Sequence, residues 1–282
     1  MVDIDCNRCC EAMGTRFEVF LCGDNAEHLE AVAVAVLEEI TRLDGVLSRF
    51  NPGSEIARIN RGAGHTPVRV DREVFALLER CEQARRLTEG YFDVTASPDR
   101  DASEQGALQL DAEIRTVRFA HPDVMVDLGG IGKGYALDCG REILLRFGVN
   151  RGLLHGGTSS VLALGSPADD DEWMIDVRHP LLPDAAPVAS VKLMNQAFSC
   201  SAVRHPGQMQ SDIVNPLTGE PLAGNAACGV LAASATDAEV FSTALLAMGR
   251  ERATNFLAKK LDSELDVGWF EPNVGFIWIK SR

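Results

Sequence analysis

The segment Val126-Asp127-Leu128-Gly129-Gly130-Ile131-Gly132-Lys133-Gly134 joins a short apolar run to a helical pattern. We expect a strand over 124–128 and a helix from about Tyr135 to Phe147. Unpaired backbone N–H groups and the helix dipole at such a helix start favour a phosphate or pyrophosphate, and Lys133 adds a positive charge. The glycine spacing is neither that of a P-loop nor that of the G-x-G-x-x-G dinucleotide fingerprint. The segment therefore predicts an anion-binding turn, or a tight strand-to-helix turn that binds nothing.

Helical and strand patterns are mixed along the rest of the chain. Apolar residues recur at helical spacing over 26–47 and 236–248, and Asp71 is expected to cap another helix that stops at Gly90. Residues 98–123 are polar and are expected to form loops or a hairpin. Strand-like runs are Phe17–Leu21, Leu153–Leu154, Val161–Leu164, Trp173–Val177, Val188–Leu193, Cys228–Ala233 and Phe276–Ile279. The pattern predicts an α/β or α+β fold, without saying which strands pair.

The composition excludes some classes of function. The 282 residues include 27 Lys and Arg against 41 Asp and Glu, a formal charge of −14, so no basic surface for nucleic acid is expected. There is no apolar run of about 18 residues, so no membrane span is expected. Charged residues interrupt the first twenty positions, which argues against a signal peptide. We therefore expect a cytoplasmic protein.

The eight cysteines are too few for a disulfide scaffold. Cys6, Cys9 and Cys10 form a C-x-x-C-C cluster that could bind a metal, but no second pair lies at a matching distance for a four-ligand zinc site. The alternative is a short mobile N-terminus, about residues 1–12, that happens to carry thiols. No linker divides the rest, so the prediction is one domain over residues 1–282.

Three further segments carry polar groups that suit chemistry. A glycine pair, Gly156-Gly157, follows His155 and could turn a backbone carbonyl toward a ligand, or could be a plain turn. The segment from Asp212 to Pro221 is a turn sequence that needs no function to explain it. Glu239 and Thr243 are four residues apart on one helix face, where a carboxylate and a hydroxyl could hold magnesium. The alternative for this pair is a Glu and a Thr that only favour the helix.

Taken in order, these segments resemble the ApbE family of FAD:protein FMN transferases, from Met13 almost to the C-terminus. The stretches that carry the resemblance are Met13-Gly14-Thr15, Ser48-Arg49-Phe50, Ser54 to Asn60, Gly90 to Thr95, Asp127 to Asp138, Gly156-Gly157, Trp173 to Pro180, Asn215 to Gly219, and Glu239 with Thr243. The resemblance implies an ApbE-like, T-fold-related architecture in which helices pack on mixed sheets.

The resemblance also implies a function. It predicts a magnesium-dependent enzyme that cleaves the pyrophosphate of its substrate FAD, attaches FMN to a threonine of an acceptor flavoprotein, and releases AMP. Such a reaction needs a metal across the pyrophosphate, donors for its oxygens, and a base for the threonine. FAD and the acceptor are the expected partners. Family members are often exported, whereas this chain shows no signal peptide.

The resemblance assigns site residues by position. The diphosphate and adenosine side is expected at Gly129, Gly130, Gly132 and Lys133. The flavin side is expected near Met13, Gly14, Thr15, Asn60 and Asp93, and Tyr91 and Asp127 belong to the same cofactor-binding set. The metal is expected at Glu239, Thr243 and a backbone carbonyl of the Gly156-Gly157 turn, hence Gly157. Asp212 is the expected catalytic base.

Several positions depart from the family pattern. Glu239 stands where the family usually has Asp, and Asp212 stands where it has the histidine of H-I-x-x-P-x-T-G. An ordinary aspartate, with a pKa near 3.9, is a weak base at pH 7 unless burial raises it. The usual Thr-Ser-Gly is altered to Phe198-Ser199-Cys200-Ser201, and Thr158 follows the glycine pair where many relatives have Asp or Asn.

These departures leave three functions open. The first is an active FMN transferase with a modified metal site and base. The second is an FAD-binding paralogue with lost or slowed transfer, and the third is an FAD pyrophosphatase in which water replaces the threonine.

Overall fold

An eight-stranded antiparallel sheet forms the centre of the computed structural model, which describes residues 4–97, 106–168, 171–182, 184–204, 207–259 and 265–280. Every neighbouring pair in the sheet is antiparallel. In spatial order its strands are β1 (Cys6–Ala12), β2 (Thr15–Leu21), β6 (Gly152–Gly156), β7 (Ser160–Leu164), β10 (Ala197–Ala202), β11 (Ala227–Ala232), β12 (Asp266–Glu271) and β13 (Gly275–Lys280).

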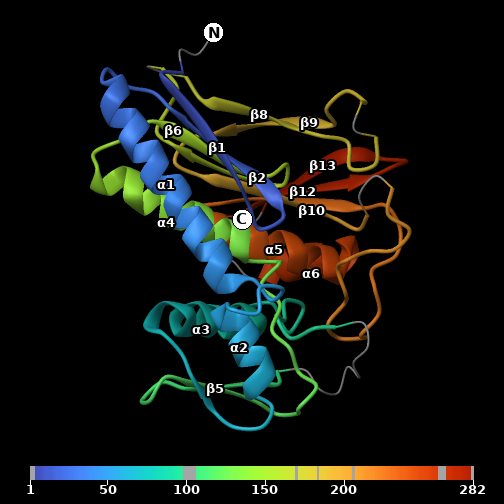
Figure 1. Cartoon of the computed structure of the whole chain (residues 1–282). Helices are drawn as coiled ribbons and strands as arrows, with labels where there is room; N and C mark the ends of the chain where they lie inside the picture. Colours follow the sequence, from blue (N-terminus) through green and yellow to red (C-terminus); the bar gives the residue numbers. More distant parts are fainter. Residues whose placement is uncertain are drawn as a thin grey trace.

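Four helices lie along one face of this sheet (Figure 1). They are α1 (Ala26–Leu47), α4 (Gly132–Arg146), α5 (Ala235–Met248) and α6 (Arg250–Lys259). Helix α5 packs on β10, β11 and α4, and most of its residues are buried, as expected for a helix with neighbours on several sides. Among the helices in the described ranges, none has the length and apolar character needed to cross a membrane.

A two-stranded hairpin covers the opposite face of the sheet. It consists of β8 (Trp173–Val177) and β9 (Ala189–Leu193), and Figure 1 shows it on the far side of the sheet from the helices. Its inward residues, such as Trp173 and Val191, form a second apolar cluster with Phe198 and Leu231 of the sheet. Burial on both faces explains why several central strands are apolar throughout.

A smaller part lies beyond the helix layer, at the bottom of Figure 1. It contains α2 (Glu55–Gly62), α3 (Arg72–Leu87) and a three-stranded sheet of β3 (Val68–Arg69), β5 (Thr116–Phe119) and β4 (Leu108–Asp111). Its buried residues, including Leu78 and Phe119, belong to the same apolar cluster as the helices and the main sheet.

The prediction of a mixed α/β fold is confirmed, and the helix predicted over 26–47 has those bounds in α1. The strand predicted over 124–128 is wrong: that stretch joins no sheet, because the side chain of Asn60 and the backbone of Val94 take its hydrogen bonds. The helix after it begins at Gly132, three residues earlier than predicted.

The N-terminal segment also differs from the expectation of a mobile stretch over about residues 1–12. From Cys6 to Ala12 it is strand β1, paired with β2 along its whole length. Side chains alternate across a strand, so Cys6 and Cys10 pack against the core while Cys9 is exposed on the other face. The three thiols therefore do not converge on one point, which removes the metal-binding alternative for this cluster.

Helices α4 and α5 meet unusually closely, and their contact positions the residues discussed below. Asp138 of α4 caps the start of α5: its carboxylate accepts hydrogen bonds from Ala235 N at 2.9 Å, Thr236 N at 3.0 Å and Thr236 Oγ1 at 2.5 Å. A Cβ on Gly134 would lie 2.3 Å from the carbonyl oxygen of Ala235, so only glycine allows this approach.

Gly134→Ala is therefore expected to lower the free energy of unfolding by about 1–3 kcal/mol, the usual cost of overpacking a close contact. Gly45→Ala is the matched control, because Gly45 is exposed in α1 and its Cβ would meet nothing within 4 Å. That substitution should instead stabilise the protein by about 0.5–1 kcal/mol. Urea denaturation followed by circular dichroism measures both, and equal effects of the two would contradict the packing argument.

Candidate active site

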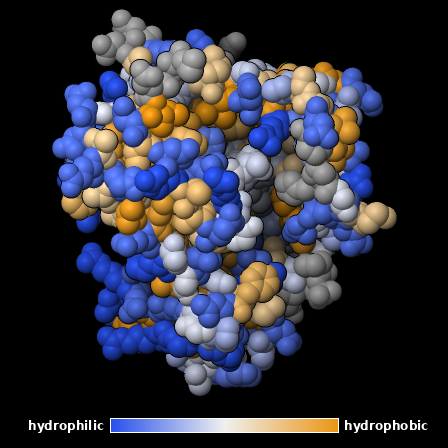
Figure 2. Space-filling view, turned by 45° about the horizontal axis from the view of Figure 1, so that its top comes forward, coloured by the Kyte–Doolittle hydropathy of each residue, from blue (hydrophilic) through white to orange (hydrophobic). Residues whose placement is uncertain are grey.

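A cavity of about 570 Å³ opens where the main sheet, α4, α5 and the smaller part meet. Figure 2 shows the molecule hollowed near the middle of one face. The lining residues that the sequence analysis predicted for the site are Met13, Gly14, Thr15, Tyr91, Asp93, Asp127, Gly129, Gly130, Lys133, Asp212, Glu239 and Thr243. Segments far apart in the chain thus converge on one space.

The tip of the β1–β2 hairpin forms one wall of this cavity. Its two turn residues, Met13 and Gly14, both have positive φ, 51° and 71°, as a type I′ hairpin turn requires. Thr15 follows and packs against Gly157: a Cβ on Gly157 would lie 2.4 Å from Thr15 Oγ1. Gly157 itself has a φ of 69° and is not a lining residue, whereas the next two residues, Thr158 and Ser159, are.

The glycine turn forms the floor of the cavity and is fixed from both sides. Asp127 Oδ1 accepts a hydrogen bond from Gly129 N at 2.9 Å, while Asp127 Oδ2 pairs with Arg49 Nε at 3.1 Å. Asn60 does not line the cavity. Its side-chain amide donates to Val126 O at 3.0 Å and its oxygen accepts from Val126 N at 2.7 Å, so Asn60 holds the backbone that leads into the turn.

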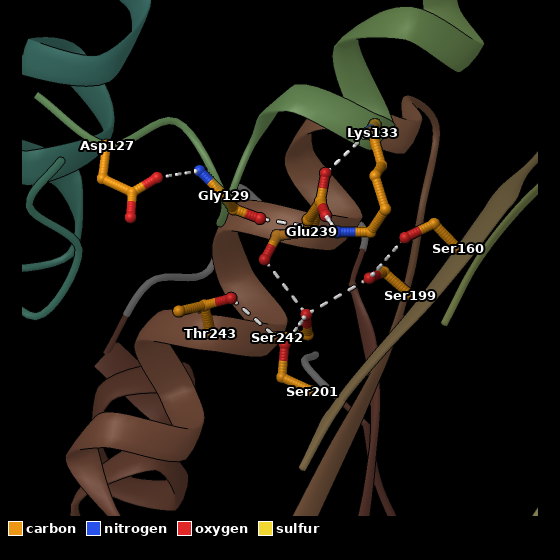
Figure 3. Close-up of polar contacts among 10 residues, drawn as sticks. Asp127, Gly129, Lys133, Ser160, Ser199, Ser201, Glu239, Ser242 and Thr243 are labelled. Atoms are coloured by element: carbon orange, nitrogen blue, oxygen red, sulfur yellow. Dashed lines mark hydrogen bonds and ion pairs between the residues drawn. The ribbon is translucent and has the colours of Figure 1, made fainter. Parts of the chain in front are cut away.

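The start of α4 faces a buried carboxylate from α5. Glu239 is 3% exposed, and its Oε2 accepts a hydrogen bond from Gly134 N at 2.5 Å. Its Oε1 forms an ion pair with Lys133 Nζ, which also donates to Gly129 O at 3.4 Å (Figure 3). The carboxylate of Glu239 thus neutralises the Lys133 ammonium and the positive end of the α4 dipole.

Hydroxyl groups lie behind Glu239 and Thr243. Ser201 of β10 is hydrogen-bonded to Thr243 at 3.1 Å and to Ser242 at 2.8 Å, and Ser199 and Ser160 continue the group toward β7 (Figure 3). From the sequence, Ser199 and Ser201 are part of an altered family motif and have no expected role at the site. Their alternation along β10 places both on the face toward α5.

Two carboxylates line other parts of the cavity. Asp93 binds its own loop: Oδ1 accepts from Thr95 N and Thr95 Oγ1, and Oδ2 accepts from Gly106 N. Asp212 is exposed and accepts a hydrogen bond from Gln208 Nε2 at 2.7 Å. The described residues around Asp212 therefore do not bury its carboxylate.

A second, smaller cavity of about 230 Å³ adjoins the first and shares Met13, Gly14, Asp127, Gly129 and Lys133 with it. Gly132 lies here rather than in the larger cavity. The smaller cavity is also lined by Arg49 and Phe50. Phe50 is 79% exposed, and the Arg49 guanidinium lies 4.4 Å from the centroid of its ring. These two residues are not among those expected at the site from the sequence, although an aromatic beside an arginine in a loop is a recognisable signal for a ligand surface.

Cys200 is the cavity-lining group that most resembles a nucleophile, but its environment argues against that role. Burial raises the pKa of the Cys200 thiol to about 12. Thiol reactivity requires the thiolate, which this pKa makes rare at neutral pH. Cys200 is therefore a small apolar wall residue.

These features define a class: a protein of helices packed on an antiparallel sheet, with a cleft where a glycine turn and a helix start suit an anionic ligand. The sequence model of the ApbE family matches residues 13–267. The chain therefore belongs to the ApbE family, as the sequence resemblance indicated.

Individual relatives agree with the family assignment. The FAD:protein FMN transferase of Klebsiella pneumoniae (strain 342) is 26% identical over 263 residues, which cover 83% of this chain and 81% of the relative. The protein of the same name from Treponema pallidum (strain Nichols) is 27% identical over 268 residues, covering 79% and 74%. The crystal structure of the ApbE protein from Thermotoga maritima superposes with a TM-score of 0.82 at 23% identity, covering 98% and 96% of the two chains, which shows a shared fold.

The pKa of Cys200 gives a direct test of its environment. Because the pKa is raised to about 12, the thiol stays protonated as pH rises through 8, and iodoacetamide should leave it unmodified in the native protein. Cys9, which is exposed, is the internal control and should be labelled. Peptide mass spectrometry after labelling at pH 8 measures both, and labelling of Cys200 at the rate of Cys9 would contradict the raised pKa of the Cys200 thiol.

Proposed function

We propose that the protein is a magnesium-dependent FAD:protein FMN transferase. It would cleave the pyrophosphate of FAD, attach FMN to a threonine of an acceptor flavoprotein and release AMP. The observation that carries the proposal is the buried Glu239 carboxylate, which contacts the start of α4 and lines the same cavity as the glycine turn. Relatives that bear this activity in their names support it over most of the chain.

The reaction would be a phosphoryl-type transfer. The acceptor hydroxyl oxygen forms a bond to the phosphorus of the FMN half, and the bond from that phosphorus to the bridging oxygen breaks. The bridging oxygen leaves with AMP, and the hydroxyl proton passes to a base. Negative charge grows on the leaving phosphate, so groups that stabilise this charge accelerate the reaction.

Residues around the cavity would divide the recognition of FAD. Gly129, Gly130 and Gly132 present a turn and a helix start to the diphosphate and adenosine side, where Lys133 contributes an ammonium group. The hairpin tip, with Met13, Gly14 and Thr15, would shape the flavin side. Tyr91, Asp93 and Asp127 would complete the cofactor-binding wall, with Asn60 supporting the turn from behind.

The donor set fits magnesium. Mg²⁺ prefers oxygen ligands and is commonly held by one or two carboxylates together with waters and substrate phosphates. Glu239 and Thr243 offer a carboxylate and a hydroxyl to the same cavity. A carbonyl of the turn at Gly157, which adjoins the lining residue Thr158, would be a third ligand. In the part of the chain that the structure describes, no group of three His, Cys, Asp or Glu side chains could hold an ion, so phosphate oxygens would be needed. Magnesium, when bound there, would neutralise the charge on the diphosphate.

The Glu239 carboxylate would interact with both Lys133 and the magnesium ion. Glu239 already forms an ion pair with the Lys133 ammonium in the structure. The negative charge of its carboxylate is therefore stabilised by a positive charge before any magnesium binds. A carboxylate this deeply buried needs such a partner, because an unpaired buried charge is strongly unfavourable.

Asp212 would be the base that accepts the threonine proton. It lines the cavity, and Gln208 holds one of its carboxylate oxygens. The other oxygen is the one that a hydroxyl of the acceptor could approach.

The deciding experiment combines the purified protein with FAD, Mg²⁺ and an acceptor domain that carries a target threonine. Mass spectrometry of the acceptor is expected to show an FMN-sized increment, with AMP released in equal amount. Omission of Mg²⁺ should abolish both signals. AMP without the increment would favour an FAD pyrophosphatase, tight FAD binding with neither product would favour a binding paralogue, and absence of FAD binding would refute all three functions.

Asp212→Ala tests the base. Transfer should fall by about two to four orders of magnitude, the usual contribution of a general base, while the affinity for FAD changes little. Glu220→Ala is the matched control, because Glu220 is an exposed carboxylate of the same loop that does not line the cavity. Normal transfer by the Asp212 variant would show that another group accepts the proton.

A further inference from the structure

A chain of hydroxyl groups connects Thr243 to the backbone of its own helix. Thr243 Oγ1 lies 3.1 Å from Ser201 Oγ, and Ser201 Oγ lies 2.8 Å from Ser242 Oγ (Figure 3). Ser242 Oγ in turn lies 3.0 Å from the carbonyl oxygen of Glu239, one turn back in α5. Ser242 is completely buried, so no solvent competes for these hydrogen bonds at that end.

The carbonyl at the end of the chain sets the direction of every hydrogen in it. A carbonyl oxygen can only accept, so Ser242 is the donor to Glu239 O at 3.0 Å, and it is also the donor in its longer contact with Ser199. Ser242 Oγ is then available to Ser201 only as an acceptor, and Ser201 donates to it. Ser201 Oγ consequently accepts from Thr243.

We propose that Ser201 and Ser242 are positioning residues that fix the orientation of the Thr243 hydroxyl. Because Thr243 gives its hydrogen to Ser201, its oxygen lone pairs are left for the cavity, as a cation ligand requires. Without this arrangement the hydroxyl could turn its hydrogen toward the cavity and repel a cation. The inference rests on the proposed function, in which Thr243 helps to hold magnesium.

A branch of the same group supplies the matched control. Ser199 lies 3.4 Å from Ser242 and 3.4 Å from Ser160, both longer contacts than those of the directed chain. Ser160 is as buried as Ser242, but it is not on the path from Glu239 O to Thr243. Loss of the Ser160 hydroxyl should therefore lower the stability of the protein, as loss of the Ser201 or Ser242 hydroxyl does, without reorienting the Thr243 hydroxyl.

The experiment is titration of Mn²⁺, as a stand-in for Mg²⁺, by calorimetry into the protein saturated with FAD and without an acceptor, so that the phosphate oxygens are present. Ser201→Ala and Ser242→Ala should each weaken Mn²⁺ binding by about three- to tenfold, the loss that one hydrogen bond produces. Ser201→Thr, which keeps a hydroxyl, should restore binding, and Ser160→Ala should leave it unchanged. FAD affinity without metal should be the same in all of these variants.

A double-mutant cycle shows whether Ser201 acts through Thr243. In a Thr243→Val background, Ser201→Ala should weaken Mn²⁺ binding no further, because there is no hydroxyl left to orient. Equal losses from Ser201→Ala and Ser160→Ala, or unchanged binding in Ser201→Ala, would overturn the proposal, as would wild-type protein that binds no Mn²⁺. If the protein binds Mn²⁺ but transfers no FMN, the proposed function fails, while the comparison among the serine variants still decides this inference.

Discussion

The hydrogen bonds from the start of α5 to the carboxylate of Asp138 are the constraint on which the site depends. They fix where α5 begins relative to α4, and Gly134 lets the two helices come close enough for those bonds to form. Glu239 is one turn further along α5, and for that reason its carboxylate meets Gly134 N and Lys133. One capping interaction thus brings an acidic group from one helix to the positive end of another.

The smaller part of the molecule holds the backbone of the glycine turn, in addition to supplying residues that line the cavity. Asn60 of α2 bonds both backbone groups of Val126, and Val94 accepts from Asp127 N. The glycine turn is therefore held at one end by α4 and at the other by hydrogen bonds to this smaller part. Its geometry depends on two pieces of structure that are distant in sequence, so a change in helix α2 around Asn60 would alter the position of Gly129.

The elements that could be predicted from the sequence are those with a regular apolar pattern and clear end signals within one short stretch of chain. Helix α1 has an uninterrupted apolar stripe and a clear N-cap, Asn25, so its bounds follow from the sequence alone. The stretch over 124–128 is as apolar as a strand, but a side chain 66 residues away takes its hydrogen bonds. Strand β10 was not predicted because two small polar residues, Ser199 and Ser201, face α5 where an ordinary strand would have apolar ones. Most of the expected site residues line the cavity, whereas the pairing of Lys133 with Glu239 joins positions 106 apart and has no local signal.

The hairpin tip has a kinetic consequence. Two consecutive residues with positive φ, Met13 and Gly14, close a turn whose register is set by the full length of β1 and β2, so the tip keeps its shape without help from a bound molecule. The glycine turn opposite is likewise held by side chains of the protein. A ligand that fits between them meets walls that are already in place, and its affinity is not reduced by the entropy of ordering a loop. Its association should then be limited by diffusion and orientation rather than by a conformational change.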